Sequence, residues 1–198
     1  MEKKIKLIKP YISFDEIETE LREVLDSGQL TKGVNVNKLI ASLSDYTGAK
    51  HSFLTTSATT ALTLCLKALN IQAGDKVAVS DFSFPATANV VEDLGATPVF
   101  IDVDKQSYNM CPKDLVAKLD ESVKAIIFVD ALGNPSGIDK IMEICRAKKI
   151  PVIQDSACAL GSSCDGKKVG NIADLTCFSF HPRKLLTTGE GGAILTNN

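Results

Sequence analysis

Short apolar runs alternate along this chain with segments of helical length, and this alternation constrains the fold more than any other feature. The runs are continuous and rich in β-branched residues, which is typical of strands buried on both faces of a sheet. Helix-length connections between such strands favour a parallel arrangement. The sequence therefore predicts an α/β fold in three layers: a mostly parallel sheet with helices on both faces. Its predicted strands cover residues 77–79, 98–103, 125–129, 151–153, 176–180 and 193–196.

The segments between these runs carry helical signals. Residues 13–16 read Ser-Phe-Asp-Glu, a capping-box pattern, and a stripe of apolar residues follows before Gly28. A turn at residues 165–168 predicts a hairpin. We assign residues 1–12 to an N-terminal lead and residues 13–198 to one domain. The stripe comprises Ile17, Leu21, Val24 and Leu25, and further helices are predicted near 35–46 and over 58–69, 86–94, 112–120 and 137–149.

Composition argues against several classes of protein. The 198 residues are 44% hydrophobic and 23% charged, enough for one substantial core. A formal net charge of −2 provides no basic surface for nucleic acid or a membrane. The first residues are too charged for a secretory signal, and the apolar runs are shorter than the roughly 20 residues of a spanning helix, so we expect a cytoplasmic protein. Six scattered cysteines and two histidines disfavour a zinc site and predict reduced, mostly buried thiols.

Polar residues follow the predicted strands where a parallel sheet binds its ligands. Asp155 comes directly after one run, and Ser179, His181 and Lys184 end or follow another. Small residues at 55–59 precede a helix, whose free backbone N–H groups could bind an anion. Each feature also has a common structural explanation: a helix cap, a loop carboxylate, a histidine with a purely structural role or a solvated lysine. Taken singly, the residues leave both interpretations open.

In order, these segments resemble the DegT/DnrJ/EryC1/StrS family of nucleotide-sugar aminotransferases, which are fold-type I enzymes using pyridoxal 5′-phosphate (PLP). The resemblance runs from about Ser27 to the last residue. It implies the large domain of that fold. Six motifs in the same order carry it: SGQLTKG (27–33), TTSATTALTLCLKAL (55–69), SFPATANVVEDLGATPVFIDVD (83–104), GNP (133–135), QDSACALGSS (154–163) and SFHPRKLLTTGEGG (179–192).

The resemblance also implies roles for individual residues. Lys184 would form the Schiff base with the cofactor aldehyde and then move a proton during transamination. Asp155 would pair with the pyridine nitrogen, and Phe84 would stack on the ring. The other cofactor-binding residues implied are Ser57, Ala58, Thr59 and Ser179 around the phosphate, with Cys158 and His181 nearby. The expected partners are a nucleotide-sugar substrate, an amino-acid donor such as glutamate and a second copy of the chain in a homodimer.

Two departures from the family pattern leave alternatives open. The resemblance implies histidine or glutamine where this chain has Cys158. It also implies a smaller C-terminal domain, which we expect this chain to lack because the residues given stop at Asn198. The leading interpretation is an aminotransferase, because Lys184 is retained where a related dehydratase branch has histidine. The alternative is a truncated, non-catalytic fragment that binds PLP or serves in dimerisation. A different PLP reaction, such as desulfuration or decarboxylation, is disfavoured by the sequence around Lys184.

Overall fold

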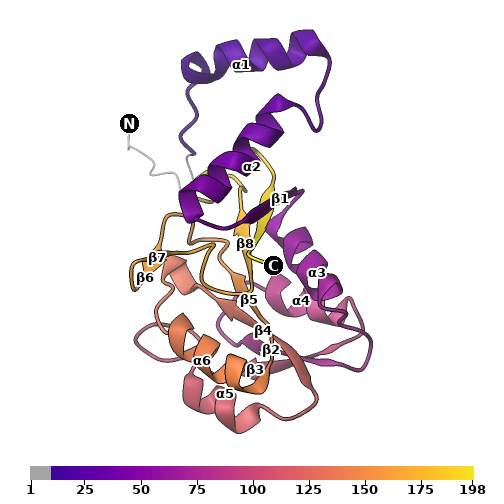
Figure 1. The fold of residues 1–198 in the computed structure, drawn as a ribbon, viewed down its shortest axis with the longest axis vertical. Coiled ribbons are helices and arrows are strands. Elements are labelled where there is room, and N and C mark those ends of the chain that lie inside the picture. The colour runs from indigo at the N-terminus through magenta and orange to yellow at the C-terminus, as the bar shows by residue number, and fades with distance from the viewer. Residues whose placement is uncertain (1–9) are drawn as a thin grey trace, which may run out of the picture.

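A seven-stranded mixed sheet forms the centre of the computed structural model, which describes residues 10–198 (Figure 1). The strand order is β1-β9-β8-β5-β4-β2-β3, and only β9 runs against its neighbours. The mostly parallel α/β sheet predicted from the sequence is therefore confirmed. Its strands are β1 (His51–Thr55), β2 (Lys76–Ser80), β3 (Thr97–Ile101), β4 (Val123–Val129), β5 (Val152–Asp155), β8 (Leu175–Ser179) and β9 (Gly192–Thr196).

The helices cover both faces of this sheet. Helices α3 and α4 pack on one face against a core that includes Leu66, Val79 and Ile127, whereas α5 and α6 pack on the other face around Phe128 and Ile141. These cores follow from the continuous apolar strands, which supply buried side chains to both faces. The helices are α1 (Phe14–Ser27), α2 (Val34–Thr47), α3 (Ala58–Ala68), α4 (Ala86–Glu92), α5 (Pro112–Lys118) and α6 (Ile138–Lys148), with a short 3-10 turn η1 (Ala131–Gly133).

The order of the strands creates a site at one edge of the sheet. After β2 the chain goes outward to β3, and then returns to the other side of β2 to form β4, β5 and β8. Open sheets bind ligands at the carboxyl ends of their strands, next to such a reversal. The carboxyl ends of β4, β5 and β8 carry Asp130, Asp155 and Ser179, so these residues lie at one edge.

Helix α1 stands apart from the sheet and contributes no buried residue (Figure 1). The helix ends as predicted, because Gly28 adopts a left-handed conformation with φ 66° and its N–H bonds to Leu25. The capping box is not formed: the Ser13 side chain makes no cap hydrogen bond. The predicted apolar stripe is exposed rather than packed, with Leu25 61% exposed. An amphipathic helix normally buries such a face, so α1 is an unpartnered element.

Other differences from the sequence predictions are local. The edge strand β1 was not predicted; it pairs antiparallel with β9 from His51↔Thr196 to Thr55↔Gly192.

The predicted hairpin exists, as β6 (Ser163–Cys164) and β7 (Lys167–Lys168). All six cysteines are free; Cys65, Cys145 and Cys177 are buried, Cys111 and Cys164 are half-buried, and Cys158 is exposed. Within residues 10–198, no helix combines the length and the apolar character needed to cross a membrane.

Candidate active site

The loop between β8 and β9 carries Lys184 and is held at both of its ends. Phe180 N–H donates to Gly191 O at 2.9 Å, and Thr188 N–H donates back to Phe180 O at 3.1 Å. The Lys184 N–H closes a turn on His181 O at 2.8 Å. The loop therefore starts and ends on two adjacent antiparallel strands, which fixes the path of the half-buried Lys184 across the edge of the sheet.

The Lys184 side chain reaches the loop that follows β5. Its Nζ donates to Cys158 Sγ at 3.2 Å. Its positive charge also lies close enough to Asp155 to lower the pKa of that carboxyl group. Lys184, Cys158 and Asp155 thus form one cluster at the carboxyl ends of β5 and β8, as expected for a site at this edge.

Asp155 is a buried carboxylate that receives hydrogen bonds from two directions. Thr87 Oγ1 donates to Oδ2 at 2.9 Å, and Ala157 N–H donates to Oδ1 at 3.3 Å. Burial raises the pKa of Asp155, while the two hydrogen bonds and Lys184 oppose that rise. In the described part of the chain it has no salt-bridge partner within 4.0 Å. A buried carboxylate in this state gains from a cationic hydrogen-bond donor such as a pyridinium N–H.

Thr87 is a site residue that the sequence analysis did not identify. It lies in the first turn of α4, is buried, and its Oγ1 is 2.6 Å from Ser83 Oγ. The two hydroxyl groups link the loop after β2 to Asp155, so Thr87 orients the carboxylate. Its signal in the sequence was its position three residues after Phe84 in the SFPAT segment, at the start of a short helix.

The start of α3 meets β8 and β9 at a junction that we call the anion cradle, the candidate site for a phosphate. Ser57 caps α3 by accepting from Thr60 N–H at 3.1 Å. The N–H groups of Ala58 and Thr59, the first of the helix, have no intrahelical acceptor, as is usual at a helix start. A Cβ atom on Gly192 would lie 2.5 Å from Ser57 C and 2.7 Å from Ala58 N. Only glycine permits this approach. Because Gly192 pairs with Ser179, the cradle lies beside the β8 hydroxyl.

Two predicted residues lie at the margins of this cluster. Phe84 is 75% exposed in the loop before α4, and its carbonyl accepts from Thr87 N–H at 3.1 Å. A ring in that position is free to stack on a planar ligand. His181 interacts within its own loop: Nδ1 accepts from Arg183 N–H at 3.1 Å, and Nε2 lies 3.7 Å from Glu190 Oε1. Its role at the cofactor stays a prediction.

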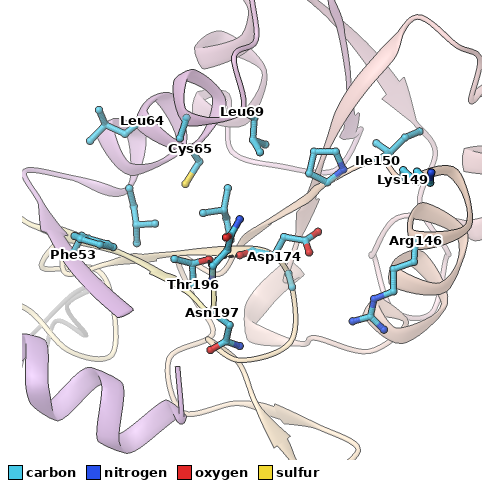
Figure 2. Close-up of a pocket in the computed structure, with 16 residues that line it drawn as sticks. Phe53, Leu64, Cys65, Leu69, Arg146, Lys149, Ile150, Asp174, Thr196 and Asn197 are labelled. Carbon is cyan, nitrogen blue, oxygen red and sulfur yellow. Dashed lines mark hydrogen bonds between the residues drawn. The ribbon is translucent and has the colours of Figure 1, made fainter. Parts of the chain in front are cut away.

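A separate cavity lies at the opposite end of these strands. It has a volume of about 1040 Å³ and is lined by α3, α6 and the ends of the central strands (Figure 2). Leu64 and Cys65 line one side, Arg146 and Lys149 the other, and Asp174 lies between them (Figure 2). These groups surround the amino ends of β5 and β8, opposite to Asp155. None of the predicted site residues lines it, so the candidate site remains at the carboxyl ends.

The cluster offers an amine, a buried carboxylate and free N–H groups at a helix start, which are the groups that the sequence resemblance implies for a PLP site. A family model described as the DegT/DnrJ/EryC1/StrS aminotransferase family matches residues 12–198. The chain belongs to this family. The resemblance found in the sequence motifs is thereby confirmed, and PLP is the cofactor of the family.

Similar proteins in the DegT/DnrJ/EryC1/StrS family act on nucleotide sugars. A UDP-2-acetamido-2-deoxy-3-oxo-D-glucuronate aminotransferase of Pseudomonas aeruginosa is 39% identical over 93% of this chain and 52% of its own length. A GDP-perosamine synthase of Escherichia coli O157:H7 is 34% identical over 99% of this chain and 54% of its own. The chain therefore spans about half the length of the curated relatives it matches.

Solved structures agree with this assignment. Helicobacter pylori PseC, an aminotransferase involved in the biosynthesis of pseudoaminic acid, superposes with a TM-score of 0.93 at 34% identity, covering 99% of this chain and 53% of PseC. Spr1654 of Streptococcus pneumoniae, described as a sugar aminotransferase and solved in its PLP form, gives a TM-score of 0.93 at 34% identity over 98% of this chain and 53% of its own. The fold-type I prediction is thus confirmed.

Proposed function

We propose that this chain takes part in PLP-dependent transamination of a nucleotide-linked keto-sugar, with an amino acid such as glutamate as the donor. The observation that carries the proposal is the Lys184 amine lying beside buried Asp155 at the carboxyl ends of β5 and β8. The relatives named above act on nucleotide sugars, which supports the substrate class.

The residues of the site fit the cofactor. Bound PLP supplies an aldehyde that takes up an amino group and a ring that withdraws electrons from the adjacent carbon. Lys184 Nζ would hold that aldehyde covalently and later carry the proton between carbon atoms. Asp155 would keep the ring nitrogen protonated, and Thr87 would hold the carboxylate in place. The N–H groups of Ala58 and Thr59, with Ser179, would bind the phosphate.

Absorbance tests the cofactor step. The purified chain is incubated with PLP, freed of excess cofactor and scanned in the visible range. We expect a band that is lost on Lys184→Ala and kept in Lys167→Ala, a lysine exposed on the β6–β7 hairpin. Reduction with borohydride should fix the cofactor to Lys184, which peptide mass analysis locates. A colourless wild-type protein would refute the cofactor assignment.

A non-catalytic fragment is the second candidate, and the observation that favours it is length, because the chain covers about half of its relatives. Addition of glutamate separates the two candidates. A half-transamination shifts the visible band and yields 2-oxoglutarate, which supports the aminotransferase. A stable band with no 2-oxoglutarate supports the fragment that only binds the cofactor.

We also propose that the protein is a cytoplasmic homodimer. The support for the dimer is the exposed apolar face of α1, which includes Phe14 at 58% and Leu25 at 61% exposure. A second copy could bury this face, since exposed apolar patches of this kind mark interfaces. The support for the compartment is six free thiols, which are typical of a reducing environment.

A further inference from the structure

A second buried carboxylate, Asp130, lies directly behind the proposed cofactor partner. It follows β4, where its N–H donates to Asp155 O at 3.0 Å. Its side chain is 2% exposed, and in the described residues it has no salt-bridge partner within 4.0 Å. Neither the transamination proposed above nor the phosphate cradle uses this group. A buried carboxylate without a cation is costly to keep, so its contacts indicate what it does.

Those contacts are made to the two residues that flank Asp155. Gln154 Nε2 donates to both Asp130 oxygens, at 2.9 and 3.1 Å, and Ser156 Oγ donates to Oδ2 at 2.6 Å. Side chains alternate between the two faces of a strand. Gln154 and Ser156 therefore point to the face covered by α5 and α6, whereas Asp155 points to Thr87 on the other face.

The loop that carries Asp130 is itself fixed. Asn109 Oδ1 accepts from Ala131 N–H at 3.0 Å, and Asn109 Nδ2 donates to Asn134 O and Ser136 O, both at 2.8 Å. Asp130 thus has a rigid support on one side and holds the residues before and after Asp155 on the other. A displacement of about 1 Å at a reacting group can cost a hundredfold in rate, so this support matters for a cofactor partner.

We propose that Asp130 is a positioning residue for Asp155, which it anchors on both sides and supplies with a nearby negative charge. The inference rests on the proposed function, since it concerns how Asp155 is held for the cofactor ring. Asp130 does not touch the cofactor in this scheme. It acts through the backbone of β5 and through its charge.

The charge of Asp130 changes in the neutral range. Burial raises the pKa of its carboxyl group to about 7; Ser156 and Gln154 oppose the rise, and Asp155 adds to it. The titratable groups that face Asp130 are Asp155 at the end of β5 and the half-buried Cys164 on β6. An ionised Asp130 attracts a cationic ring nitrogen bound to Asp155, so binding of that cation should strengthen as Asp130 loses its proton.

Two substitutions separate the effect of Asp130 on the position of Asp155 from the effect of the Asp130 charge. Asp130→Asn keeps an oxygen that can accept from Ser156. Its new amide would face Gln154 Nε2, so the Gln154 amide must turn over for its Oε1, a buried atom without a partner in the described structure, to accept from it. With that rearrangement the substitution removes the charge and keeps a hydrogen bond to each neighbour. Asp130→Ala removes both functions. Lys124→Ala, on the exposed side of β4, is the matched control.

The test is the dissociation constant of PLP at about pH 6 and pH 8.5, measured by absorbance titration. Asp130→Ala should weaken binding roughly tenfold at both pH values, as loss of a hydrogen-bonded anchor implies. Asp130→Asn should bind like the wild type at the lower pH and about threefold or more weaker at the higher pH, the effect of a missing charge. Parallel profiles for wild type and Asp130→Asn, or an unchanged Asp130→Ala, would overturn the proposal.

A second readout works without cofactor and keeps this inference separate from the proposed function. If the wild type binds no PLP, the proposed function fails, and the carboxyl 13C shift of Asp130 still reports on its neighbour. The Asp130 pKa should be lower in Asp155→Asn than in the wild type, because the negative charge of Asp155 helps to raise it. An unchanged Asp130 pKa would show that the two carboxyl groups are not coupled and would contradict the part of the proposal that rests on charge.

Discussion

Lys184 Nζ donates a hydrogen bond to Cys158 Sγ at 3.2 Å, so the lysine proposed to hold the cofactor lies against the one exposed cysteine of the described chain. The family resemblance implies histidine or glutamine at the Cys158 position. Here the thiol is both accessible and adjacent to the amine, and this makes it a reporter of the site.

We expect iodoacetamide to alkylate Cys158 faster than the other five cysteines, because accessibility limits the reaction of a thiol. Bound PLP should slow that reaction by covering the site. Peptide mass analysis over time measures both effects. In Lys184→Ala the protection should weaken. Equal rates with and without PLP, in protein that shows the visible band, would contradict the placement of Cys158 beside the cofactor.

Gly192→Ala should disrupt the phosphate cradle. The new Cβ would lie 2.5 Å from Ser57 C, so β9 or the start of α3 must move. We expect roughly 1–3 kcal/mol of destabilisation, the usual cost of overpacking, together with a larger loss of PLP affinity. Gly189→Ala is the control, since its Cβ meets no atom within 4 Å and only the backbone at φ 86° is strained. Chemical denaturation and PLP titration measure the two effects, and equal PLP affinities in the two variants would argue against the cradle.

Stability of the cofactor-free protein should fall as the pH rises from about 4 to 7. Asp130 has a folded-state pKa of about 7, raised from 3.8 by burial, so the folded state binds its proton more tightly than the unfolded state. This contribution is complete below about pH 4 and is lost as the pH passes through about 7. The loss is at most about 4 kcal/mol. Burial also raises the pKa of Asp155, so this group adds a further loss of stability as the pH rises.

Urea unfolding at several pH values measures this dependence. Asp130→Asn should flatten the curve, because the amide does not ionise. Ser156→Ala should retain a slope, since it removes one hydrogen bond and leaves the buried carboxyl group in place. A wild-type curve that rises steadily across this range would contradict the raised pKa of Asp130.

Leu21→Glu should shift the oligomeric state toward the monomer if α1 forms the dimer interface. Leu21 is 40% exposed on the apolar face of α1, and a carboxylate there would be buried without a partner in the dimer. Sedimentation or light scattering over a range of concentrations measures the change. Arg22→Glu, one residue along on the polar face, is the control. A wild-type protein that is monomeric at high concentration would contradict the proposed interface.

Local patterns were sufficient to predict most of the sheet and its helices. Continuous runs such as that at 125–129 and helix signals such as Gly28 act over a few residues, and both appear in the structure. Strand β1 was missed because its residues, HSFLT, contain no continuous apolar run, and the strand is defined by its pairing with β9, far along the chain. A short edge strand of this kind has a weak local signal.

In the candidate site, too, residues with a local signal were predicted and residues defined by long-range contacts were missed. Motif order brought out Lys184 and Asp155, whose positions after buried strands are visible in the sequence. Thr87 and Asp130 were missed, because a threonine early in a helix and an aspartate after a strand are ordinary there. Their roles depend on hydrogen bonds across the sheet to residues distant in sequence, which only the folded structure defines.

The contact between Gly192 and the start of α3 joins two segments that lie far apart in the sequence. Loop closure over such a span is slow compared with the formation of helices or of the sequential β2 to β5 region. During synthesis, the central strands can therefore fold well before β9 emerges and pairs with β1 and β8. Affinity for the cofactor should appear only with that last pairing, so cofactor capture would serve as a signal that the chain has folded through to β9.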